Sequence, residues 1–256
     1  MARLTPALMR ALDIMELFVE RGARWNAAQI AEATGLPRTT VHELLTTLTH
    51  RGYLTRDEIG NFELGVRTVQ LGNAYAARFD LLGAATEVAR DVGQATGHTC
   101  SVAIREGAEV FYLAKVEGSE SLSLISSVGK RAPASCTGLG KALLSELEPA
   151  EVDRLYPTGQ LPALSEHSIT DLGQLKKALA TSRLRGYAIE REESGPGVAC
   201  AAAVIRDAAG AAVAALSISV PLARWDQLPE KYWADIALEG SGRLSEQLGW
   251  IDRNAG

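Results

Sequence analysis

Residues 26–65 read NAAQIAEATGLPRTTVHELLTTLTHRGYLTRDEIGNFELG, and this stretch decides the fold of the N-terminal part of the chain. After Pro37, apolar residues recur at the i, i+3, i+4, i+7 spacing of one buried helix face, at Val41, Leu44, Leu45 and Leu48. A shorter helix precedes them, and Gly35 between the two is the residue type that a tight turn with positive φ requires. The pattern predicts a helix-turn-helix, in which the second helix reads the major groove of DNA.

The flanking residues favour the same interpretation. Asn26 can cap the first helix, and Gln29 stands three residues later, where its side chain can reach back to complete a capping box. Residues 53–55 and 62–64 have the composition of strands and flank a turn that contains Gly60-Asn61, a pair suited to positive φ. The stretch therefore predicts a two-stranded wing after the helices, with an ordinary pair of packed helices as the alternative.

Composition limits the classes of protein to which the chain can belong. Its 256 residues allow one large or two modest domains, and a hydrophobic content of 46% is enough for a globular core. No apolar run reaches the ~20 residues of a membrane helix. Residues 1–15 lack the features of a secretory signal and instead predict an amphipathic helix that begins at Pro6. Because the three cysteines are widely spaced, we expect free thiols and a cytoplasmic protein without membrane contact.

The net charge of −5 is unevenly distributed along the chain. Residues 1–67 carry eight arginines against eight Asp and Glu, whereas residues 68–256 carry 18 basic and 23 acidic side chains. A neutral DNA-binding unit is unusual, because phosphate neutralisation supplies most non-specific affinity. We therefore expect weak non-specific binding that becomes useful when two or more copies act together.

Beyond residue 65 the pattern indicates a second domain. Residues 66–96 read as a nearly continuous helix with Gly72 and Gly83 as possible breaks. The expected strands then span 99–104, 109–116, 121–128, 187–192, 200–207 and 211–220, and the expected helices span 138–147, 149–156, 171–184 and 229–248. Strands interrupted by helices indicate an α/β two-domain chain of the α+β kind, with a helix-covered antiparallel sheet in the C-terminal domain.

A binding site in this second domain can be argued from the residues themselves. Along residues 215–220, strand alternation places the hydroxyls of Ser217 and Ser219 on one face and three apolar side chains on the other. Two hydroxyls on one face are either satisfied locally or directed at a ligand. Cys200 lies on the strand before the serines, and Glu190 on the strand before that can accept a ligand hydroxyl or the proton of a hydrate.

The start of the helix at residue 138 offers a seat for an anion. The segment CTGLGK at 136–141 leads into this helix, and its glycines expose backbone N–H groups at the positive end of the helix dipole. The segment is not a nucleotide-binding P-loop, because Lys141 is followed by Ala142. We expect a small carboxylate, such as a keto acid, a sugar acid or an aromatic acid.

Over its whole length the chain resembles the IclR family of bacterial transcription regulators. The segments that carry the resemblance are PALMRALDIMELF at 6–18, IAEATGLPRTTVHELLTTLTHRGYL at 30–54, Leu64-Gly65, APASCTGLGKALLSEL at 132–147, LRGYAIEREESGPGVACAAAV at 184–204 and AALSISVP at 214–221. The resemblance implies an N-terminal winged helix-turn-helix and a C-terminal GAF-like effector-binding domain. It also implies homodimers or homotetramers that bind pseudopalindromic double-stranded operator DNA.

The resemblance assigns roles to single positions. It implies an effector pocket lined by Gly138, Leu139, Glu190, Cys200, Ser217 and Ser219, with an apolar wall near Leu122 and Leu124. In the DNA-binding domain we expect contacts from the start of the second helix and from two arginines beyond it, namely Arg38, Thr39, Thr40, His42, Glu43, Arg51 and Arg56. Glu43, Asn61 and Glu63 depart from the family pattern, which is usually or often basic at these positions, and this reduces the expected phosphate contacts of the wing.

Other function classes stay open at this point. Cys136, Cys200, His98 and His167 are candidates for a nucleophile and a base, and His98 with Cys100 for a metal site, but none has tight ligand spacing or an activating motif. We predict no catalytic residue, no metal and no cofactor. The alternatives are a small-molecule-processing enzyme and an oligomerising scaffold with an adapted helix-turn-helix.

The sequence thus predicts a transcriptional regulator of a catabolic operon, with repression favoured over activation, that responds to a small organic acid. The expected domains are a DNA-binding domain at 1–66, a linker helix at 67–80 and an effector-binding and oligomerisation domain at 81–256. The identity of the acid, and whether it releases or strengthens DNA binding, cannot be read from the sequence.

Overall fold

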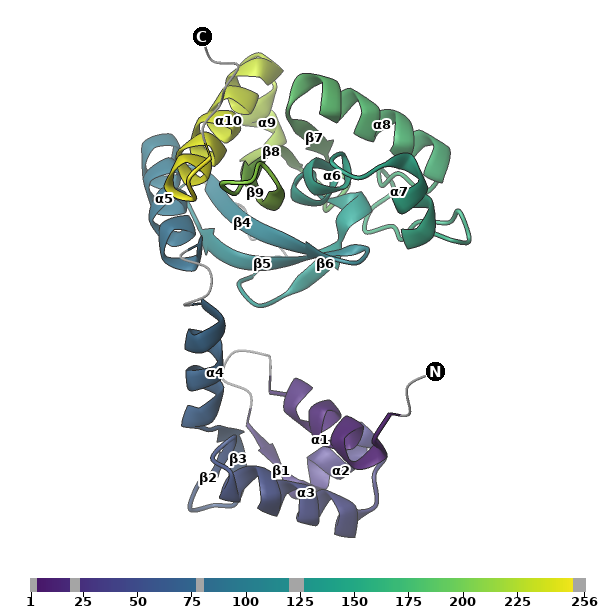
Figure 1. The fold of residues 1–256 in the computed structure, drawn as a ribbon, viewed down its shortest axis with the longest axis vertical. Helices are drawn as coiled ribbons and strands as arrows, with labels where there is room; N and C mark the ends of the chain where they lie inside the picture. The colour runs from purple at the N-terminus through teal and green to yellow at the C-terminus, as the bar shows by residue number, and fades with distance from the viewer. Residues whose placement is uncertain (1–3, 19–23, 77–80, 120–126, 251–256) are drawn as a thin grey trace. The chain divides into compact units, whose positions relative to one another are not determined.

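The computed structural model describes residues 4–18, 24–76, 81–119 and 127–250. The chain divides into two compact units, residues 1–79 and residues 80–256, and each has its own buried core (Figure 1). Within the described ranges, no helix is long and apolar enough to cross a membrane.

The N-terminal unit is a winged helix-turn-helix. Its first elements are α1 (Pro6–Glu16), β1 (Trp25–Asn26), α2 (Ala27–Thr34), α3 (Arg38–His50), β2 (Leu54–Arg56) and β3 (Asn61–Leu64), and the antiparallel strands have the order β1-β3-β2. The helices pack on one another and on the sheet around a core of Ile14, Phe18, Ile30, Val41, Leu45, Leu54 and Phe62. The predicted helix-turn-helix and wing are therefore confirmed.

Local hydrogen bonds explain where the turn of this motif forms. Asn26 Oδ1 accepts from the backbone N–H groups of Ala28 and Gln29, each at 3.0 Å. In return, Gln29 Oε1 accepts from the N–H of Asn26 at 2.9 Å, which completes the predicted capping box. Gly35 ends α2 with φ of 67°, a conformation that costs a glycine little and most other residues more.

The turn of the wing differs from the prediction. Asp57 organises it, because its Oδ1 accepts from the backbone N–H groups of Ile59 and Asn61 at 3.1 and 2.8 Å. Gly60 has φ of 95°, but Asn61 already belongs to β3 and does not take a positive φ. The aspartate side chain supplies the acceptor that closes the loop, so only one residue of the expected pair needs the left-handed region.

Two helices follow the wing, and neither breaks at the expected glycine. α4 spans Val66–Ala76 and α5 spans Leu81–Thr96. Gly72 lies inside α4 and Gly83 inside α5, so both proposed break points are wrong. Glycine weakens a helix interior by only ~1 kcal/mol, which the surrounding residues can offset.

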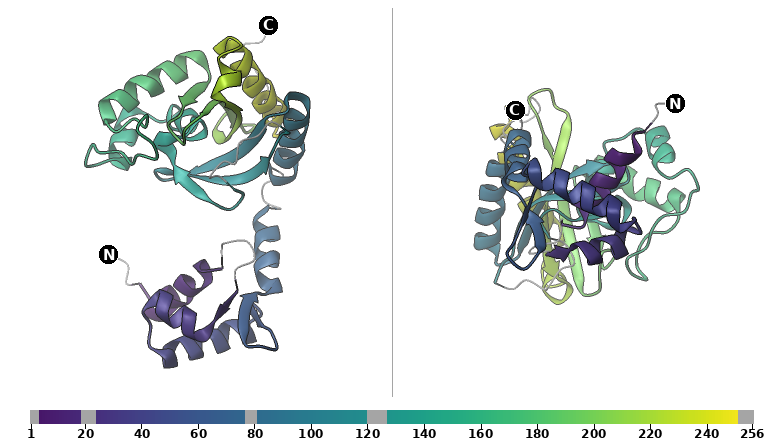
Figure 2. Two further views of the ribbon diagram at one scale, coloured as in Figure 1. Left: turned by 180° about the vertical axis from the view of Figure 1, so that it is seen from behind. Right: turned by 90° about the horizontal axis from the view of Figure 1, so that it is seen from below.

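The C-terminal unit is a six-stranded antiparallel sheet with helices on both faces (Figures 1 and 2). Its strands are β4 (Thr99–Glu106), β5 (Glu109–Val116), β6 (Arg131–Pro133), β7 (Ala188–Arg191), β8 (Val198–Arg206) and β9 (Ala212–Pro221), in the order β6-β5-β4-β9-β8-β7. After a 3₁₀ turn at Ala134–Cys136, its further helices are α6 (Gly138–Leu144), α7 (Pro149–Leu155), α8 (Leu172–Arg185), α9 (Leu222–Trp225) and α10 (Glu230–Gln247). The fold class predicted from the sequence is confirmed.

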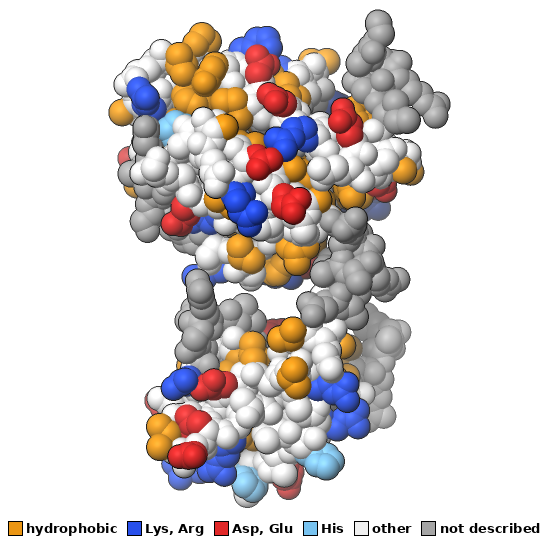
Figure 3. Space-filling model, turned by 90° about the vertical axis from the view of Figure 1, so that its left-hand side faces the viewer, with side chains coloured by type: hydrophobic (Ala, Val, Ile, Leu, Met, Phe, Trp, Pro, Cys, Tyr) orange, Lys and Arg blue, Asp and Glu red, His pale blue; other side chains and the backbone are white. Residues whose placement is uncertain are grey.

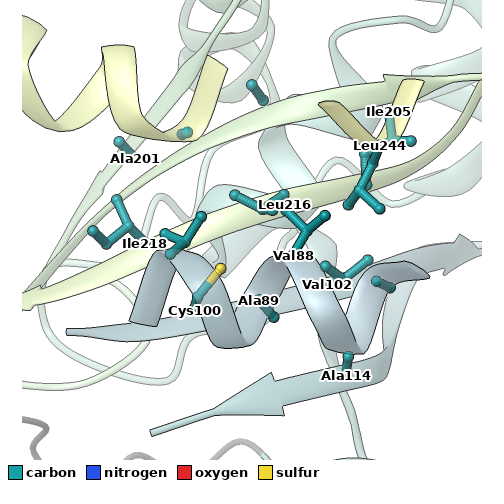
Figure 4. Close-up of a cluster of buried hydrophobic side chains, with 14 of the residues drawn as sticks. Val88, Ala89, Cys100, Val102, Ala114, Ala201, Ile205, Leu216, Ile218 and Leu244 are labelled. Carbon is teal, nitrogen blue, oxygen red and sulfur yellow. The ribbon is translucent and has the colours of Figure 1, made fainter. Parts of the chain in front are cut away.

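Each face of this sheet has its own core. α5 and α10 cover one face, where Val88, Val102, Leu216, Ile218 and Leu244 are fully buried (Figure 4). α6, α7 and α8 cover the other face, and their apolar side chains pack against the alternate residues of the same strands. Leu216 and Ile218 thus point away from the α6 face, as the predicted alternation along β9 requires.

Two strand predictions need comment. β6 was not expected, because a three-residue edge strand ending in proline carries too little periodicity to be recognised. The predicted strand at 121–128 falls almost entirely outside the described residues.

Candidate effector pocket and DNA-reading helix

A cavity of about 220 Å³ lies on the α6 face of the C-terminal sheet. Its lining consists of Ser101, Tyr112, Arg131, Ala132, Thr137, Gly138, Leu139, Leu164, Glu190, Ser194, Gly195, Pro196, Val198, Cys200, Ser217 and Ser219. It is smaller than the cavities of ~300–1,000 Å³ that hold drug-sized ligands, so it suits a smaller molecule. The lining mixes apolar walls with a few convergent polar groups, the composition expected of a small-molecule site.

Six residues predicted from the sequence lie together along this lining: Gly138, Leu139, Glu190, Cys200, Ser217 and Ser219. Leu122 and Leu124, the predicted apolar wall, lie outside the described residues. The structure therefore brings all the described members of the predicted set to one cavity, while their part in binding an effector stays a prediction.

Strand register explains how four strands bring their polar side chains to the cavity. Glu190 on β7 pairs with Cys200 on β8, and Cys200 in turn pairs with Ser219 on β9. The Cys200 thiol donates to Ser219 Oγ at 3.2 Å. One step along, Ser217 on β9 pairs with Ser101 on β4, which adds a third hydroxyl to the cavity. Paired residues in a sheet share a face, so the four strands present these polar side chains on one face, in two neighbouring rows.

The start of α6 closes one side of the cavity. Thr137 Oγ1 accepts from the N–H of Gly140 at 3.0 Å and so caps the helix. The N–H groups of Gly138 and Leu139 have no acceptor within the helix, because the first donors of any α-helix lack one. Only glycine fits at position 140, since an added Cβ would lie 2.1 Å from the carbonyl oxygen of Ala134. This close approach fixes the helix start against the 3₁₀ turn before it.

Three buried ionisable side chains stand behind and beside this helix start. Lys141 Nζ forms an ion pair with Glu193 Oε1, and both side chains are buried. Glu190 is fully buried; its Oε1 accepts from the N–H of Ser194 at 2.9 Å, and its Oε2 has no hydrogen-bond partner among the described residues. Burial raises the pKa of the Glu190 carboxyl, although Ser194, Cys200 and Lys141 partly oppose that shift.

Several lining residues were not predicted from the sequence. Ser101 and Tyr112 come from β4 and β5, and Arg131 from the unexpected β6. Ser194-Gly195-Pro196 forms the loop between β7 and β8 at the cavity edge. The signal that was available for Ser101 is its alternation along 99–104, which matches that of Ser217 and Ser219 on their own strand.

The residues weighed for catalysis do not form a reactive group. The Cys136 thiol donates to the carbonyl oxygen of Pro162 at 3.1 Å, and the His98 ring meets the Trp233 ring edge-on at 5.3 Å. Burial raises the pKa of the Cys200 thiol well above its ordinary value, which disfavours the thiolate that a nucleophile needs. In the part of the chain that the structure describes, no three His, Cys, Asp or Glu side chains are arranged to hold a metal ion.

In the N-terminal unit, the predicted DNA-contacting residues lie on or near the second helix of the motif. Arg38, Thr39, His42 and Glu43 are exposed at the start of α3, Thr40 is half-buried there, and Arg51 and Arg56 are exposed beyond its end. The Arg56 guanidinium lies over the Phe62 ring, 5.6 Å from its centroid. Five of these residues thus lie in the first two turns of α3, whereas Arg51 follows its last residue and Arg56 ends β2.

The two wing residues that depart from the family pattern, Asn61 and Glu63, form contacts within the N-terminal unit. Glu63 Oε1 pairs with Arg24 Nε at 2.7 Å, and Asn61 Nδ2 donates to Asp57 Oδ2 at 3.2 Å. On the face drawn in Figure 3, basic and acidic side chains are interspersed rather than gathered by sign. That face of the N-terminal unit therefore carries no strongly basic patch, in agreement with the low net charge of this part of the chain.

Comparison with known proteins identifies the family from both units. The IclR helix-turn-helix domain matches residues 7–58, and the bacterial transcriptional regulator IclR C-terminal domain matches residues 73–245. The chain belongs to the IclR family. It is accordingly a DNA-binding transcriptional regulator with a C-terminal effector-binding domain, from a family of regulators rather than enzymes.

Full-length relatives extend this match. The HTH-type transcriptional regulator XynR of Escherichia coli (strain K12) is 31% identical over 242 residues, which cover 94% of this chain and 96% of the relative. The HTH-type transcriptional repressor AllR of Klebsiella pneumoniae is 31% identical over 248 residues, covering 95% of this chain and 90% of the relative.

A solved structure shows the same fold. The IclR homologue of Microbacterium hydrocarbonoxydans, complexed with 4-hydroxybenzoate, matches with a TM-score of 0.86 over 94% of this chain and 98% of that one, at 24% identity. At that identity the likeness concerns the fold alone.

Proposed function

We propose that this IclR-family regulator represses a catabolic operon, and that a small organic acid bound in the C-terminal cavity changes its affinity for operator DNA. The observation that carries the proposal is the meeting of two helix N–H donors with three serine hydroxyls in one cavity of about 220 Å³. A regulator acts on the chromosome, so we place the protein in the cytoplasm.

The carboxylate of the acid is assigned to the α6 side of the cavity. There the N–H groups of Gly138 and Leu139 can donate to one oxygen, and the hydroxyls of Ser217 and Ser219 to the other. Donors of this kind bind an anion through the partial positive charges of their N–H and O–H groups. The walls of Leu139, Tyr112 and Val198 leave room for a short apolar body.

The operator contacts are assigned to α3 and the residues after it. We expect Arg38 to contact guanine or phosphate, and Thr39 and Thr40 to contact phosphate or a thymine methyl. The remaining four residues of the predicted set, His42, Glu43, Arg51 and Arg56, are expected to make weaker contacts. Because residues 1–67 carry no net charge, useful affinity requires two or more copies on a pseudopalindromic site. The relative AllR is described as a transcriptional repressor, and this favours repression over activation for this chain.

Effector and operator are coupled by a shift between two arrangements of the protein. The acid favours one of them, and α4 carries the change from the C-terminal to the N-terminal unit. The coupling requires only that the acid bind the two arrangements with different affinity.

The effector assignment is tested by the thermal stability of the full chain with pyruvate, glyoxylate, gluconate and 4-hydroxybenzoate. A specific ligand at 100 times its Kd should add ~2.7 kcal/mol of stability. We expect Ser219→Ala to weaken binding of the active acid by about 1.5–3 kcal/mol, because a hydrogen bond to a charged group is lost. Ser182→Ala is the matched control, since that buried hydroxyl donates to the carbonyl oxygen of Ala178 at 3.0 Å, away from the cavity. Equal binding by both variants would contradict the assignment.

The DNA assignment is tested by fluorescence anisotropy on the fragment upstream of the protein's own gene, with a scrambled duplex as reference. Arg38→Ala is expected to cost about 1–3 kcal/mol of specific binding if the arginine contacts guanine. Arg10→Ala removes the same charge from exposed α1 and should leave specific affinity nearly unchanged. Equal, weak binding of the unsubstituted protein to both duplexes, with and without the acid, would favour the scaffold alternative.

A further inference from the structure

Two loops frame the opening of the cavity. One is the β7–β8 loop, which lines the cavity with residues 194–196, and the other is the segment 161–168 between α7 and α8, which contributes Leu164. Leu139 and Val198 in the same lining are buried, as the walls of a cavity should be. Leu164, in contrast, is 44% exposed, so a large apolar side chain stands where the cavity meets the solvent.

Ser168 fixes the backbone that carries Leu164. Its hydroxyl oxygen accepts from the N–H groups of Leu164 and Ser165 at 2.9 and 3.1 Å. The same hydroxyl donates to the carbonyl oxygen of Glu193 at 2.7 Å, and Ser168 is buried. Because Glu193 directly precedes the lining residues of the β7–β8 loop, one buried hydroxyl ties the two loops to each other.

Further contacts hold the segment on both sides of Leu164. The Cys136 thiol, just before α6, donates to the carbonyl oxygen of Pro162 at 3.1 Å. The hydroxyl of Ser165 donates to the carbonyl oxygen of Glu192 at 2.5 Å. The backbone around Leu164 is therefore anchored both to the region where α6 begins and to the β7–β8 loop, and this limits its adjustment to a ligand.

A leucine that is exposed and firmly held affects ligand binding in two ways. Its apolar surface gains stability when the apolar body of a ligand covers it, because that surface is then removed from water. Its volume also restricts how far a rigid ligand body extends through the opening, since protein interiors tolerate little overpacking. Both effects depend on the size of the ligand body and neither depends on its charge.

We propose that Leu164 is a specificity-determining residue that limits the size of the effector's apolar body. This inference rests on the proposed function and narrows its ligand class to acids with a compact body, which the cavity of about 220 Å³ encloses as far as Leu164. The body of a larger acid meets the Leu164 side chain at the opening. Alanine at this position removes that obstruction and leaves the donors at α6 and β9 in place.

The test measures the binding of two pairs of acids to the full chain by calorimetry: pyruvate with phenylpyruvate, and benzoate with 4-phenylbenzoate. The acids of a pair share their carboxylate head and differ by one phenyl ring. Leu164→Ala should raise the affinity for the larger acid relative to the smaller one by about tenfold or more, because apolar fit in a pocket discriminates by about 10- to 200-fold. Leu164→Phe, with a bulkier side chain, should shift the preference toward the smaller acid.

Leu184→Ala is the matched control. It removes the same atoms from a leucine of α8 that is 89% exposed and lies outside the cavity lining, so its preference within each pair should equal that of the unsubstituted protein. If the smaller acid binds but Leu164→Ala leaves the preference unchanged, the role of Leu164 is overturned while the effector pocket stands. If none of the proteins binds any of these acids or of the panel above, the carboxylate pocket itself is rejected, and the role of Leu164 with it.

Discussion

Lys141→Met is expected to lower the free energy of unfolding of the C-terminal unit by about 3–5 kcal/mol. The methionine removes the only partner that the described residues provide for the Glu193 carboxylate, which is then left charged and buried. The loss is measured in the full chain by urea unfolding followed by tryptophan fluorescence. Three of the four tryptophans, Trp225, Trp233 and Trp250, belong to this unit.

Two comparisons isolate the effect of burial. Lys176→Met breaks the surface pair with Asp153, which should change stability by less than ~1 kcal/mol because both side chains are partly solvated. A double variant, Lys141→Met with Glu193→Leu, replaces both buried charges and should recover most of the loss. If the Lys141→Met protein were as stable as the Lys176→Met protein, the Glu193 carboxylate would have to be in contact with water in the variant.

The same pair also holds the loop that edges the cavity. Glu193 immediately precedes Ser194-Gly195-Pro196, and the hydroxyl of Ser168 donates to its carbonyl oxygen at 2.7 Å. Glu192 beside it has φ of 57°, a left-handed conformation that is rare outside glycine. The loop is therefore fixed by contacts with α6 and with the segment before α8, so loss of the ion pair should weaken effector binding as well as stability.

Local patterns made much of this structure predictable. The capping box at Asn26 and Gln29, and the positive φ of Gly35, depend on residues only a few positions apart. The orientation of Ser217 and Ser219 follows from alternation within a single strand. Gly138, Cys200 and Glu190 were singled out by their places at a glycine-containing helix start and on the two strands before the serines. The family resemblance then assigned all three to one pocket, which is long-range information that spacing lacks.

The remaining features depend on register and on pairs distant in sequence. Lys141 and Glu193 are 52 residues apart, and nothing near either residue indicates that both become buried. Arg131 enters the cavity from a three-residue edge strand with no periodicity of its own. The prediction for the wing turn was wrong for a different reason. Positive φ was expected at both Gly60 and Asn61, but the Asp57 side chain accepts the hydrogen bonds that close the turn, and only Gly60 takes a positive φ.

Gly65→Ala is expected to destabilise the N-terminal unit by about 3 kcal/mol and to impair operator binding. Gly65 joins β3 to α4, and an added Cβ would lie 2.2 Å from the carbonyl oxygen of Gly52. Relief requires the junction to open, which strains two hydrogen bonds: Gly65 N–H to the Tyr53 carbonyl at 2.7 Å, and Arg67 N–H to the Gly52 carbonyl at 3.1 Å. Hydrogen exchange of the N-terminal unit and anisotropy on the operator fragment measure the two losses.

Gly72→Ala is the matched control, since it makes the same substitution seven residues later within α4. Its added Cβ meets no atom within 4 Å, and alanine in a helix interior should stabilise α4 by about 0.5–1 kcal/mol. If α4 carries the effector signal from a fixed junction, Gly65→Ala should lose the effect of the acid on DNA binding and Gly72→Ala should keep it. A Gly65→Ala protein that responds normally to the acid would mean that the close approach of Gly65 to Gly52 is dispensable for coupling, and that the signal reaches α3 by another route.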